Sequence, residues 1–420
     1  MKRRTEMHIT LLLDMIILAT LLVTSASASS ENPSRSQLYP LPSLHPLPSL
    51  VDRFQLDQSP GLQSATEAAV NNLPNAPVSP SGPSSGTKTR GNWELPSSHM
   101  IANVPWHQQQ NALFCGEGVL EGVYDYWGPD INQKEIADVA RSSSAGTWSF
   151  DIVRAGHFSY MSSAQGRFFR HDVPTAGYPE RAVGYASFPY SSDTFWLTDL
   201  KGLIAAGIPV ILLMTFQPDG GGGHYRTAIG YDDSKGIIYF SDPWGRDQKH
   251  QTKKTGITAW TYDELQSGWN YIAEGENHPY WGMIMMPWHV NVITSGSLNL
   301  GSTATVTADI TYPCPSPFDS SMYPAKDVVA VIVLPDGMSL ASGSQNIFLG
   351  DMQAGSTVEA ICTVSINKAV SGKSIMVQTQ GLVSGQVPEA HWNGVSVTYP
   401  PYSYTDAVGG NGSVQLKPSA

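Results

Sequence analysis

The spacing of apolar side chains changes from helical to strand-like along this chain, and that change limits the folds it can adopt. Apolar residues recur at helical spacing over 115–127, 132–140 and 199–206. Gly207 directly follows the third of these segments and suits the end of a helix. The pattern therefore predicts three helices in the middle of the chain.

Strand-like runs follow these helical segments. Residues 209–216, 225–231 and 237–241 are rich in β-branched, aromatic and other apolar side chains. The turn-forming residues 232–236 lie between the last two runs, which predicts a β-hairpin. Helices followed by antiparallel strands indicate an α+β domain, which we place at residues 98–289.

Beyond residue 290 the spacing becomes strictly alternating. Residues 305–312 and 358–366 place an apolar side chain at every second position, and 328–334 forms another strand-like run. Turn residues separate these runs, and no helical pattern intervenes. We therefore expect residues 290–420 to form an all-β sandwich of the Ig-like type.

The first residues of the chain have the three parts of a secretory signal. Lys2-Arg3-Arg4 gives a positive start, residues 9–23 are mostly apolar, and Ala26-Ser27-Ala28 is a small-residue cleavage site. We assign residues 1–28 to a signal peptide and expect a secreted, extracellular protein with no membrane span after cleavage. An uncleaved anchor is the alternative.

The segment that follows the signal has too few apolar side chains to form a core. Residues 29–97 are dominated by Pro, Ser and Asn, which is typical of a disordered linker. We expect ordered structure to begin near Val104. The alternative is a pro-segment that is removed on activation, because a short helix can form over residues 64–72.

Charge and composition exclude several classes of function. The formal net charge of -11 at pH 7 provides no basic surface for nucleic acid or anionic lipid. His107 and His157 have no partners at metal-ligand spacing, so we assign no metal, and we assign no cofactor.

Cys115 is the first candidate for chemistry, because it is the only cysteine in the first three hundred residues. A thiol becomes an acyl-transfer nucleophile when a base stands beside it. Gln109, six positions earlier, can offer a side-chain N–H to a developing oxyanion. Cys115 also opens the first helical segment, and a helix N-terminus is expected to lower the pKa of a thiol.

His224 and Asp242 are the candidate partners. In a hairpin that turns near Ser234, Asp242 lies within about two residues of the position directly opposite His224. The even spacing puts both side chains on one face of the sheet unless a bulge intervenes. The glycine run 220–223 ahead of His224 is expected to be a movable loop, with His224 at the start of the strand.

Each of these residues also has an ordinary interpretation. A lone cysteine is usually a small buried hydrophobe, a lone histidine is usually structural, and aspartate before proline is a common turn. The combination in this order and setting favours a Cys-His-Asp site.

At these residues the sequence resembles the papain-like cysteine peptidases of the bacteriocin-processing, double-glycine peptidase-like type. The resemblance covers roughly residues 104–287, which is under half of the chain. It implies that Cys115 is the nucleophile, His224 the base, Asp242 the residue that orients it, and Gln109 a contributor to the oxyanion hole. The matching motifs are Gln109 with Cys115-Gly116, Gly223-His224-Tyr225 with Gly230-Tyr231, and Ser241-Asp242-Pro243.

Two departures from that family bear on function. Glu117-Gly118 stands where small or proline residues are expected, and the charge of Glu117 would raise the pKa of the nearby thiol. The transporter-linked members of the family carry membrane and ATPase domains, and this sequence shows neither. Leader-peptide processing during export is therefore not the predicted activity.

These observations predict a secreted cysteine peptidase that acts on a peptide or protein substrate. One alternative is an amidase or acyltransferase that uses the same triad. A second is a non-catalytic adhesin or binding protein on a hydrolase scaffold, in which the sandwich binds a surface polymer or a protein.

The remaining cysteines and several tryptophans have structural interpretations. Cys314 and Cys362 both lie in the predicted sandwich, and we favour a disulfide between them over two buried free thiols. Four tryptophans of the predicted α+β domain could line a substrate cleft, but core packing is favoured for them. They are Trp196, Trp244, Trp260 and Trp269.

Overall fold

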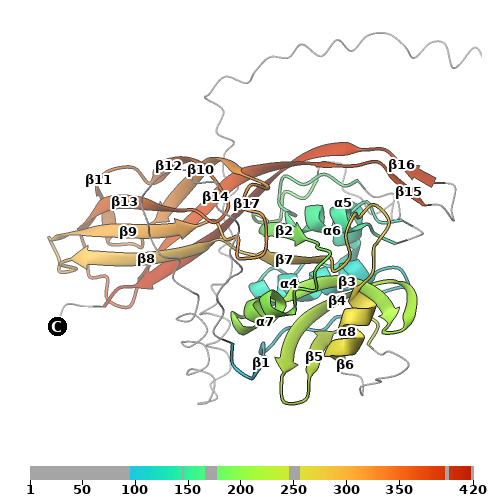
Figure 1. Ribbon diagram of the computed structural model, residues 1–420. Helices are drawn as coiled ribbons and strands as arrows, with labels where there is room; N and C mark the ends of the chain where they lie inside the picture. The colour runs from blue at the N-terminus through green and yellow to red at the C-terminus, as the bar shows by residue number, and fades with distance from the viewer. Residues whose placement is uncertain (1–94, 144–145, 166–176, 246–255, 393–396, 418–420) are drawn as a thin grey trace, which may run out of the picture. The chain divides into compact units, whose positions relative to one another are not determined.

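The computed structural model describes residues 95–143, 146–165, 177–245, 256–392 and 397–417. These residues all belong to one compact unit, His45–Ala420 (Figure 1). The predicted signal peptide and almost all of the predicted linker lie outside the described residues, so both stay predictions. No helix among the described residues is long and apolar enough to cross a membrane.

Three helices form a layer at the start of the ordered region. They are α4 (Cys115–Trp127), α5 (Gln133–Val139) and α6 (Ser149–Gly156). Helix α4 ends at Gly128, whose φ of 143° no ordinary side chain favours. Helix α5 is capped by Asn132, which forms a capping box with Glu135.

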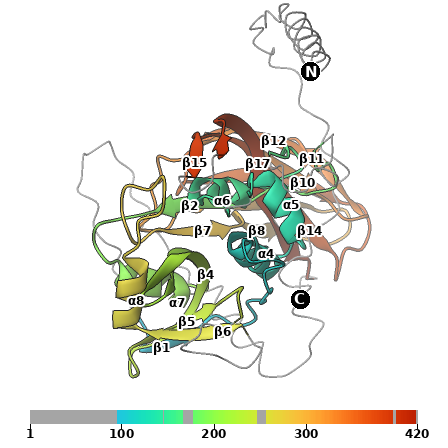
Figure 2. The same cartoon turned by 90° about the vertical axis from the view of Figure 1, so that its right-hand side faces the viewer.

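An antiparallel sheet of seven strands carries this layer. The strand order is β2-β7-β3-β4-β5-β6, and β1 also pairs with β4. Figure 2 shows the same elements from a second direction. The strands are β1 (Ser98–Met100), β2 (Ala186–Tyr190), β3 (Val210–Gln217), β4 (Gly220–Asp232), β5 (Ile237–Ser241), β6 (Ile257–Thr261) and β7 (Gly282–Met286).

The central strand β3 is buried on both faces, which explains its continuous apolar run. Ile211 and Leu213 pack with the apolar side chains of α4, α5 and α6. Val210, Leu212 and Met214 point to the opposite face, because successive residues of a strand alternate. There they pack with α7 (Leu197–Ala205) and α8 (Tyr262–Trp269).

Two local expectations about this region are wrong. Ordered structure begins before Val104, because β1 pairs with β4 and the Ile101 N–H donates to the Ile229 carbonyl at 2.8 Å. The glycine run 220–223 is the start of strand β4 rather than a loop, since Gln217 pairs with Gly220 and Thr215 with Gly223. His224 therefore lies inside the strand.

The C-terminal residues form two facing four-stranded sheets, with orders β12-β10-β14-β17 and β11-β13-β9-β8. A small pair, β15 (Ala390–Trp392) and β16 (Val397–Tyr399), lies between β14 and β17 in the chain. The strands of the two sheets are β8 (His289–Gly296), β9 (Thr303–Thr311), β10 (Ala325–Val333), β11 (Met338–Ser342), β12 (Asn346–Met352), β13 (Thr357–Ile366), β14 (Ser374–Val387) and β17 (Tyr402–Gln415).

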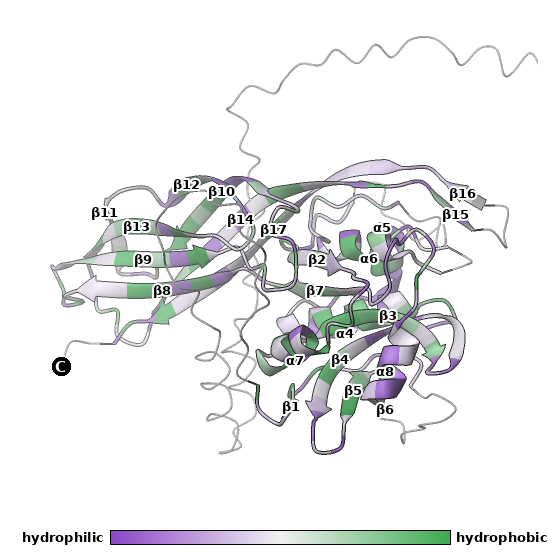
Figure 3. Cartoon of the chain, viewed as in Figure 1, coloured by the Kyte–Doolittle hydropathy of each residue, from purple (hydrophilic) through white to green (hydrophobic). Residues whose placement is uncertain are grey.

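Alternation determines which side chains enter the space between these sheets. In β9, Ala304, Val306, Ala308 and Ile310 are buried, whereas the residues between them are more exposed. Figure 3 shows the resulting mixture of hydrophobic and hydrophilic positions along each strand. The buried apolar cluster is continuous from β3 into these strands, so the predicted boundary near residue 289 stays a prediction.

The disulfide expected between Cys314 and Cys362 does not form. Cys362 is buried and Cys314 is half-buried, and both are reduced thiols. Cys362 packs within the apolar cluster of the sandwich as a small hydrophobic side chain, which is a common role for a cysteine outside a disulfide.

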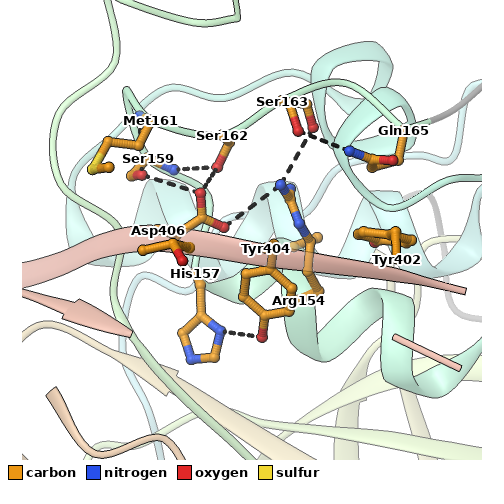
Figure 4. Close-up of polar contacts among 12 residues, drawn as sticks. Arg154, His157, Ser159, Met161, Ser162, Ser163, Gln165, Tyr402, Tyr404 and Asp406 are labelled. Carbon is orange, nitrogen blue, oxygen red and sulfur yellow. Dashed lines mark hydrogen bonds and ion pairs between the residues drawn. The ribbon is translucent and has the colours of Figure 1, made fainter. Parts of the chain in front are cut away.

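A long hairpin of the C-terminal part reaches the helical layer. Its strand β17 places Asp406 beside Arg154 of α6, with 3.6 Å between the carboxylate Oδ2 and the Arg154 Nη2 (Figure 4). Ser162 donates to the other carboxylate oxygen at 2.7 Å. Next to this pair, the Tyr404 hydroxyl lies 3.1 Å from His157 Nδ1. The hairpin is thus joined to the helices through buried polar groups.

Candidate active site

Cys115 is the first residue of α4, with its sulfur beside strand β4. The residue as a whole is half-buried. Two backbone N–H groups, those of Tyr225 and Gly116, hydrogen-bond the sulfur. Tyr225 directly follows His224, so the first turn of α4 and the start of β4 meet at the thiol. Gly116 leaves room for this approach, because a Cβ there would lie 3.3 Å from the Tyr225 ring and 2.5 Å from Ile152 of α6.

His224 and Asp242 are hydrogen-bonded, with 2.9 Å between His224 Nε2 and Asp242 Oδ1. The hairpin register produces this pairing: Thr227 lies opposite Ser241, which places Asp242 opposite Arg226 and two residues from the position opposite His224. A β-bulge does occur in this hairpin, between Ala228 and Gly230. It lies between the turn and His224 and shifts the register there by one residue. Without it, Asp242 would lie opposite Thr227 instead of Arg226.

Asp242 is fully buried and accepts hydrogen bonds on both oxygens. Arg226 Nε donates to Oδ2 at 2.7 Å, and the backbone N–H of Trp244 donates to Oδ1 at 3.0 Å. Burial opposes the charged carboxylate, but Arg226 and His224 outweigh it and hold the Asp242 pKa well below its ordinary value. Asp242 is therefore ionised at neutral pH. Because a carboxylate can only accept, His224 Nε2 carries the hydrogen and donates it to Asp242 Oδ1.

The imidazole of His224 lies in an aromatic and largely dry environment. Its side chain is 3% exposed. The ring of Phe216 contacts it edge to face, with 5.1 Å between centroids, and Trp244 in turn contacts Phe216. Burial lowers the His224 pKa, Arg226 lowers it further, and Asp242 raises it without reversing the shift. The neutral imidazole is the favoured form.

Gln109 is held against the segment that carries Asp242. Its backbone N–H donates to the Pro243 carbonyl at 2.9 Å. Its side-chain Nε2 donates to the Asn111 carbonyl at 2.7 Å, so one of the two amide hydrogens is engaged within the loop. The Oε1 atom is buried and has no hydrogen-bond partner among the described residues.

The comparisons with known proteins concern this part of the chain. A family model described as the Peptidase_C39 like family matches residues 101–274, which is less than half of the chain. That segment contains all four residues of the candidate site. It is a cysteine peptidase domain. We use the name peptidase domain for residues 101–274.

One solved structure and the curated proteins complete the comparison. The crystal structure of xylellain, a cysteine protease from Xylella fastidiosa, is similar with a TM-score of 0.31 and 13% sequence identity. The similarity covers 46% of this chain and 87% of that chain. No match is found among the curated proteins.

The expected low pKa of the thiol in the peptidase domain is wrong. Burial raises the Cys115 pKa to about 12, although the N–H groups of Tyr225 and Gly116 act in the opposite direction. The charges of Glu117 and Asp242 add to the increase. The helix N-terminus is present as predicted, but the cost of placing a thiolate in a desolvated site exceeds its contribution.

The structure accounts for the unusual glutamate after the Cys-Gly pair. The side chain of Glu117 is fully buried and accepts hydrogen bonds from the hydroxyls of Ser142 and Thr147. Burial raises the Glu117 pKa despite these two donors. Glu117 therefore belongs to a buried polar cluster and stands two residues after Cys115. Its partners lie 25 and 30 residues further along the chain, so no local pattern predicts this cluster.

Sequence reasoning missed two residues that hold the peptidase site together. Arg226 contacts Asp242 directly, and a signal for it was available: it stands two positions after His224 and so shares its face of β4. Trp106 donates from its indole Nε1 to the Asp242 carbonyl oxygen at 2.6 Å. This contact joins segments 136 residues apart, and no local pattern predicts it.

Other residues that the sequence singled out lie outside the site. Trp196, Trp260 and Trp269 are core residues, as expected, whereas Trp244 is half-buried near Phe216. His107 does have acidic partners: its Nε2 lies 2.7 Å from Asp125, and its Nδ1 lies 3.5 Å from Glu121. In the described ranges, no group of three or more His, Cys, Asp or Glu side chains is arranged to hold a metal ion.

Proposed function

We propose that this chain is a secreted cysteine peptidase in which Cys115, His224 and Asp242 form the catalytic triad. The observation that carries the proposal is the His224–Asp242 hydrogen bond at the point where the Tyr225 N–H meets the Cys115 sulfur. The match of residues 101–274 to a cysteine-peptidase family supports the same reaction class. Nucleophile, base and orienting acid therefore come from α4, β4 and the end of β5.

The tautomer of His224 assigns the proton transfers. Nε2–H is committed to Asp242, so Nδ1 is the nitrogen that accepts the thiol proton. The Cys115 sulfur attacks the scissile carbonyl while Nδ1 takes its proton. The protonated Nδ1 then gives this proton to the leaving amine, and a thioester remains. Water then attacks the thioester while Nδ1 takes its proton. The C–S bond breaks, the sulfur recovers the proton from Nδ1, and the acid product leaves as a carboxylate.

The developing oxyanion needs hydrogen-bond donors near the sulfur. The backbone N–H of Cys115 at the start of α4 and the Gln109 side chain are the proposed donors. Gln109 lies in the segment that packs against the first turn of α4, since a Cβ on Gly118 would lie 3.6 Å from the Gln109 Cα. Its second amide hydrogen is the one available for this role, because the first is bound to Asn111.

The test compares thiol variants on a mixed library of fluorogenic peptides. Cys115→Ala is expected to abolish cleavage, because it removes the attacking sulfur. Cys314→Ser removes a thiol from the sandwich and should leave cleavage unchanged. Full peptidase activity in Cys115→Ala would exclude the proposal. Cleavage of non-peptide acyl donors alone would instead assign the same triad to an amidase or acyltransferase.

A non-catalytic binding protein is the second candidate, because two C-terminal four-stranded sheets lie outside the segment that the family model matches. In such a protein the site would have lost its activity, and Cys115 would be an unreactive thiol. The C-terminal sheets would then carry the function and bind a surface polymer or a protein. Labelling with a thiol-directed peptide electrophile and mass spectrometry separates the two. Selective modification of Cys115 that His224→Ala abolishes supports the peptidase. Equal labelling of Cys115 and Cys314 supports the binding protein.

Secretion is part of the proposal and has its own test. The sequence predicts cleavage after Ala28. Mass spectrometry of the protein from the culture medium should find a mature N-terminus at Ser29 or, if the following segment is also removed, close to Ser98. Retention of residues 1–28 in a membrane fraction would contradict secretion.

A further inference from the structure

We propose that Arg226 is a positioning residue that fixes Asp242, and through it the imidazole of His224, in the geometry needed for catalysis. The inference rests on the proposed function, because it assigns a new role within the same site. Arg226 stands two residues after His224 on β4 and is fully buried.

The guanidinium of Arg226 is fixed by three hydrogen bonds. Nε donates to Asp242 Oδ2 at 2.7 Å. Nη1 donates to the Thr215 carbonyl at 3.1 Å, and Nη2 donates to the Phe216 carbonyl at 2.8 Å. The two carbonyls belong to β3, the strand paired with β4. Arg226 therefore joins the orienting carboxylate to the backbone of the central sheet.

Aromatic contacts complete the environment of Arg226. Its guanidinium carbon lies 4.6 Å from the ring centroid of Trp260, a fully buried residue at the end of β6. Phe216, which contacts His224 edge to face, is also 6.0 Å from this carbon. A planar cation suits this position because it stacks on a ring while its edge donates several hydrogen bonds.

The two oxygens of Asp242 are thereby divided between two partners. Arg226 holds Oδ2, which leaves Oδ1 to face His224 Nε2. Without Arg226, the carboxylate could rotate or share its oxygens differently, and the Nε2–H tautomer would lose its fixed acceptor. A mispositioned imidazole, or one in the other tautomer, presents the wrong nitrogen to the thiol.

A purely stabilising role explains the presence of Arg226 less well than the positioning role. Replacing a buried ion pair by apolar residues of similar volume is often neutral or stabilising, so a purely structural position favours an apolar side chain. Strand β4 is otherwise largely apolar here, with Tyr225 and Ala228 buried in the core. The charged residue stands where the strand meets the orienting carboxylate.

Two substitutions separate geometry from charge. Arg226→Lys keeps the positive charge but cannot donate to Asp242 and to both carbonyls at once. Arg226→Met removes the charge and keeps a flexible side chain of related length. We expect kcat/KM to fall about 10- to 100-fold in both variants, as for other groups that orient a catalytic residue.

Imidazole 15N NMR supplies a readout that a structural role would not change. In the wild type, His224 should show the neutral Nε2–H tautomer. In Arg226→Met its titration should move to higher pH, because a nearby positive charge has been removed. In Arg226→Lys the titration should stay near that of the wild type while kcat/KM falls.

Arg154→Met is the matched control, because Arg154 is also a buried arginine paired with an aspartate, Asp406. It should lower the thermal midpoint and leave the His224 NMR signals unchanged. If Arg226→Met does not fold, as judged by near-ultraviolet circular dichroism, Arg226→Lys decides the question by its kcat/KM.

The outcomes distinguish this inference from the proposed function. Folded Arg226 variants with kcat/KM within about twofold of wild type and unchanged His224 signals would overturn the positioning role, since removal of an orienting group costs more than that. A wild type that cleaves no peptide, but whose His224 tautomer depends on Arg226, would refute the peptidase and support the positioning role.

Discussion

At the residue scale, the candidate site rests as a neutral pair rather than as a thiolate and an imidazolium. Burial raises the pKa of Cys115 to about 12 and lowers that of His224. Both shifts disfavour the charged forms, because neither ion is well solvated in this environment. In the proposed mechanism the proton therefore moves from sulfur to nitrogen during the attack on the substrate, when the developing oxyanion can be stabilised at the same time.

This resting state makes a prediction about pH. A general base must be neutral, and the pKa of His224 lies below its ordinary value of 6.5. Loss of kcat/KM on acidification should therefore occur below pH 6.5, as His224 becomes protonated. A profile of initial rates against pH, corrected for reversible unfolding, checks the prediction. An acidic limb above pH 6.5 would show that His224 is more basic than its burial implies.

Sequence reasoning reached the central residues but not their electrostatics. His224 and Asp242 could be grouped because the hairpin spacing brings their segments together, although the β-bulge that sets their final register was not predicted. The pKa direction of Cys115 could not be predicted, because desolvation depends on the tertiary packing around it. The same holds for Trp106, which reaches Asp242 from a distant segment.

At the scale of elements, the site depends on how closely α4 approaches the end of β5. Gly118 in the first turn of α4 faces this contact: a Cβ there would lie 2.9 Å from Pro243 Cβ and 3.5 Å from the His107 carbonyl oxygen. Asp242 immediately precedes Pro243. The missing side chain at Gly118 thus allows the helix that carries Cys115 to approach the segment that carries Asp242.

Gly118→Ala should therefore impair catalysis more than folding. We expect kcat/KM to fall about tenfold, because a shift of a few tenths of an ångström separates Asp242 from its partners. Crowding should cost about 1–3 kcal/mol of unfolding free energy, partly offset by the better helix propensity of alanine, about 1 kcal/mol. Steady-state kinetics and urea unfolding measure the two effects.

Gly222→Ala is the control for replacing a glycine near the site. Its added Cβ would meet no atom within 4 Å, so the unfolding free energy should stay close to that of the wild type. Equal kinetic behaviour of Gly118→Ala and the wild type would show that α4 has room for a side chain at this contact.

Element prediction succeeded where the local signal was strong. Helix α4 and strand β5 have the predicted bounds, since a helical pattern ending at Gly128 and a hairpin turn define them. The short elements α6, β2 and β7 were not predicted. Their apolar runs are brief and carry few capping or turn signals, so tertiary packing decides their structure.

At the scale of the whole molecule, the C-terminal hairpin is tied to the helical layer by one buried ion pair and by hydrogen bonds from a second buried arginine. Arg154 pairs with Asp406 of β17, as Figure 4 shows. Arg141 pairs with Asp151 at 2.9 Å and donates to the Pro400 carbonyl of the hairpin at 2.7 Å. The hairpin thus supplies the charged partner of Arg154 and a backbone acceptor for Arg141.

Apolar contacts also join the two parts of the chain, so their unfolding is expected to be coupled. Trp288 stacks on Tyr312 with 4.4 Å between centroids, and Tyr312 also contacts Phe188 of β2. The sequence predicts two separate domains because the spacing of apolar residues changes near residue 290. The contacts that join the two parts connect residues far apart in the sequence, so the spacing does not show them. We therefore expect the described residues of both parts to unfold together.

A double-mutant cycle on Arg154 and Asp406 measures this coupling. Each single variant, Arg154→Met or Asp406→Asn, leaves a buried group without its partner and should cost about 3–5 kcal/mol of unfolding free energy. The double variant should cost less than the sum, and a single transition should persist. The exposed pair Lys326–Asp351, which joins β10 to β12 at 2.7 Å, is the control and should show little coupling. Additive costs for Arg154 and Asp406, or two separate unfolding transitions in the wild type, would show that the sandwich folds independently of the peptidase domain.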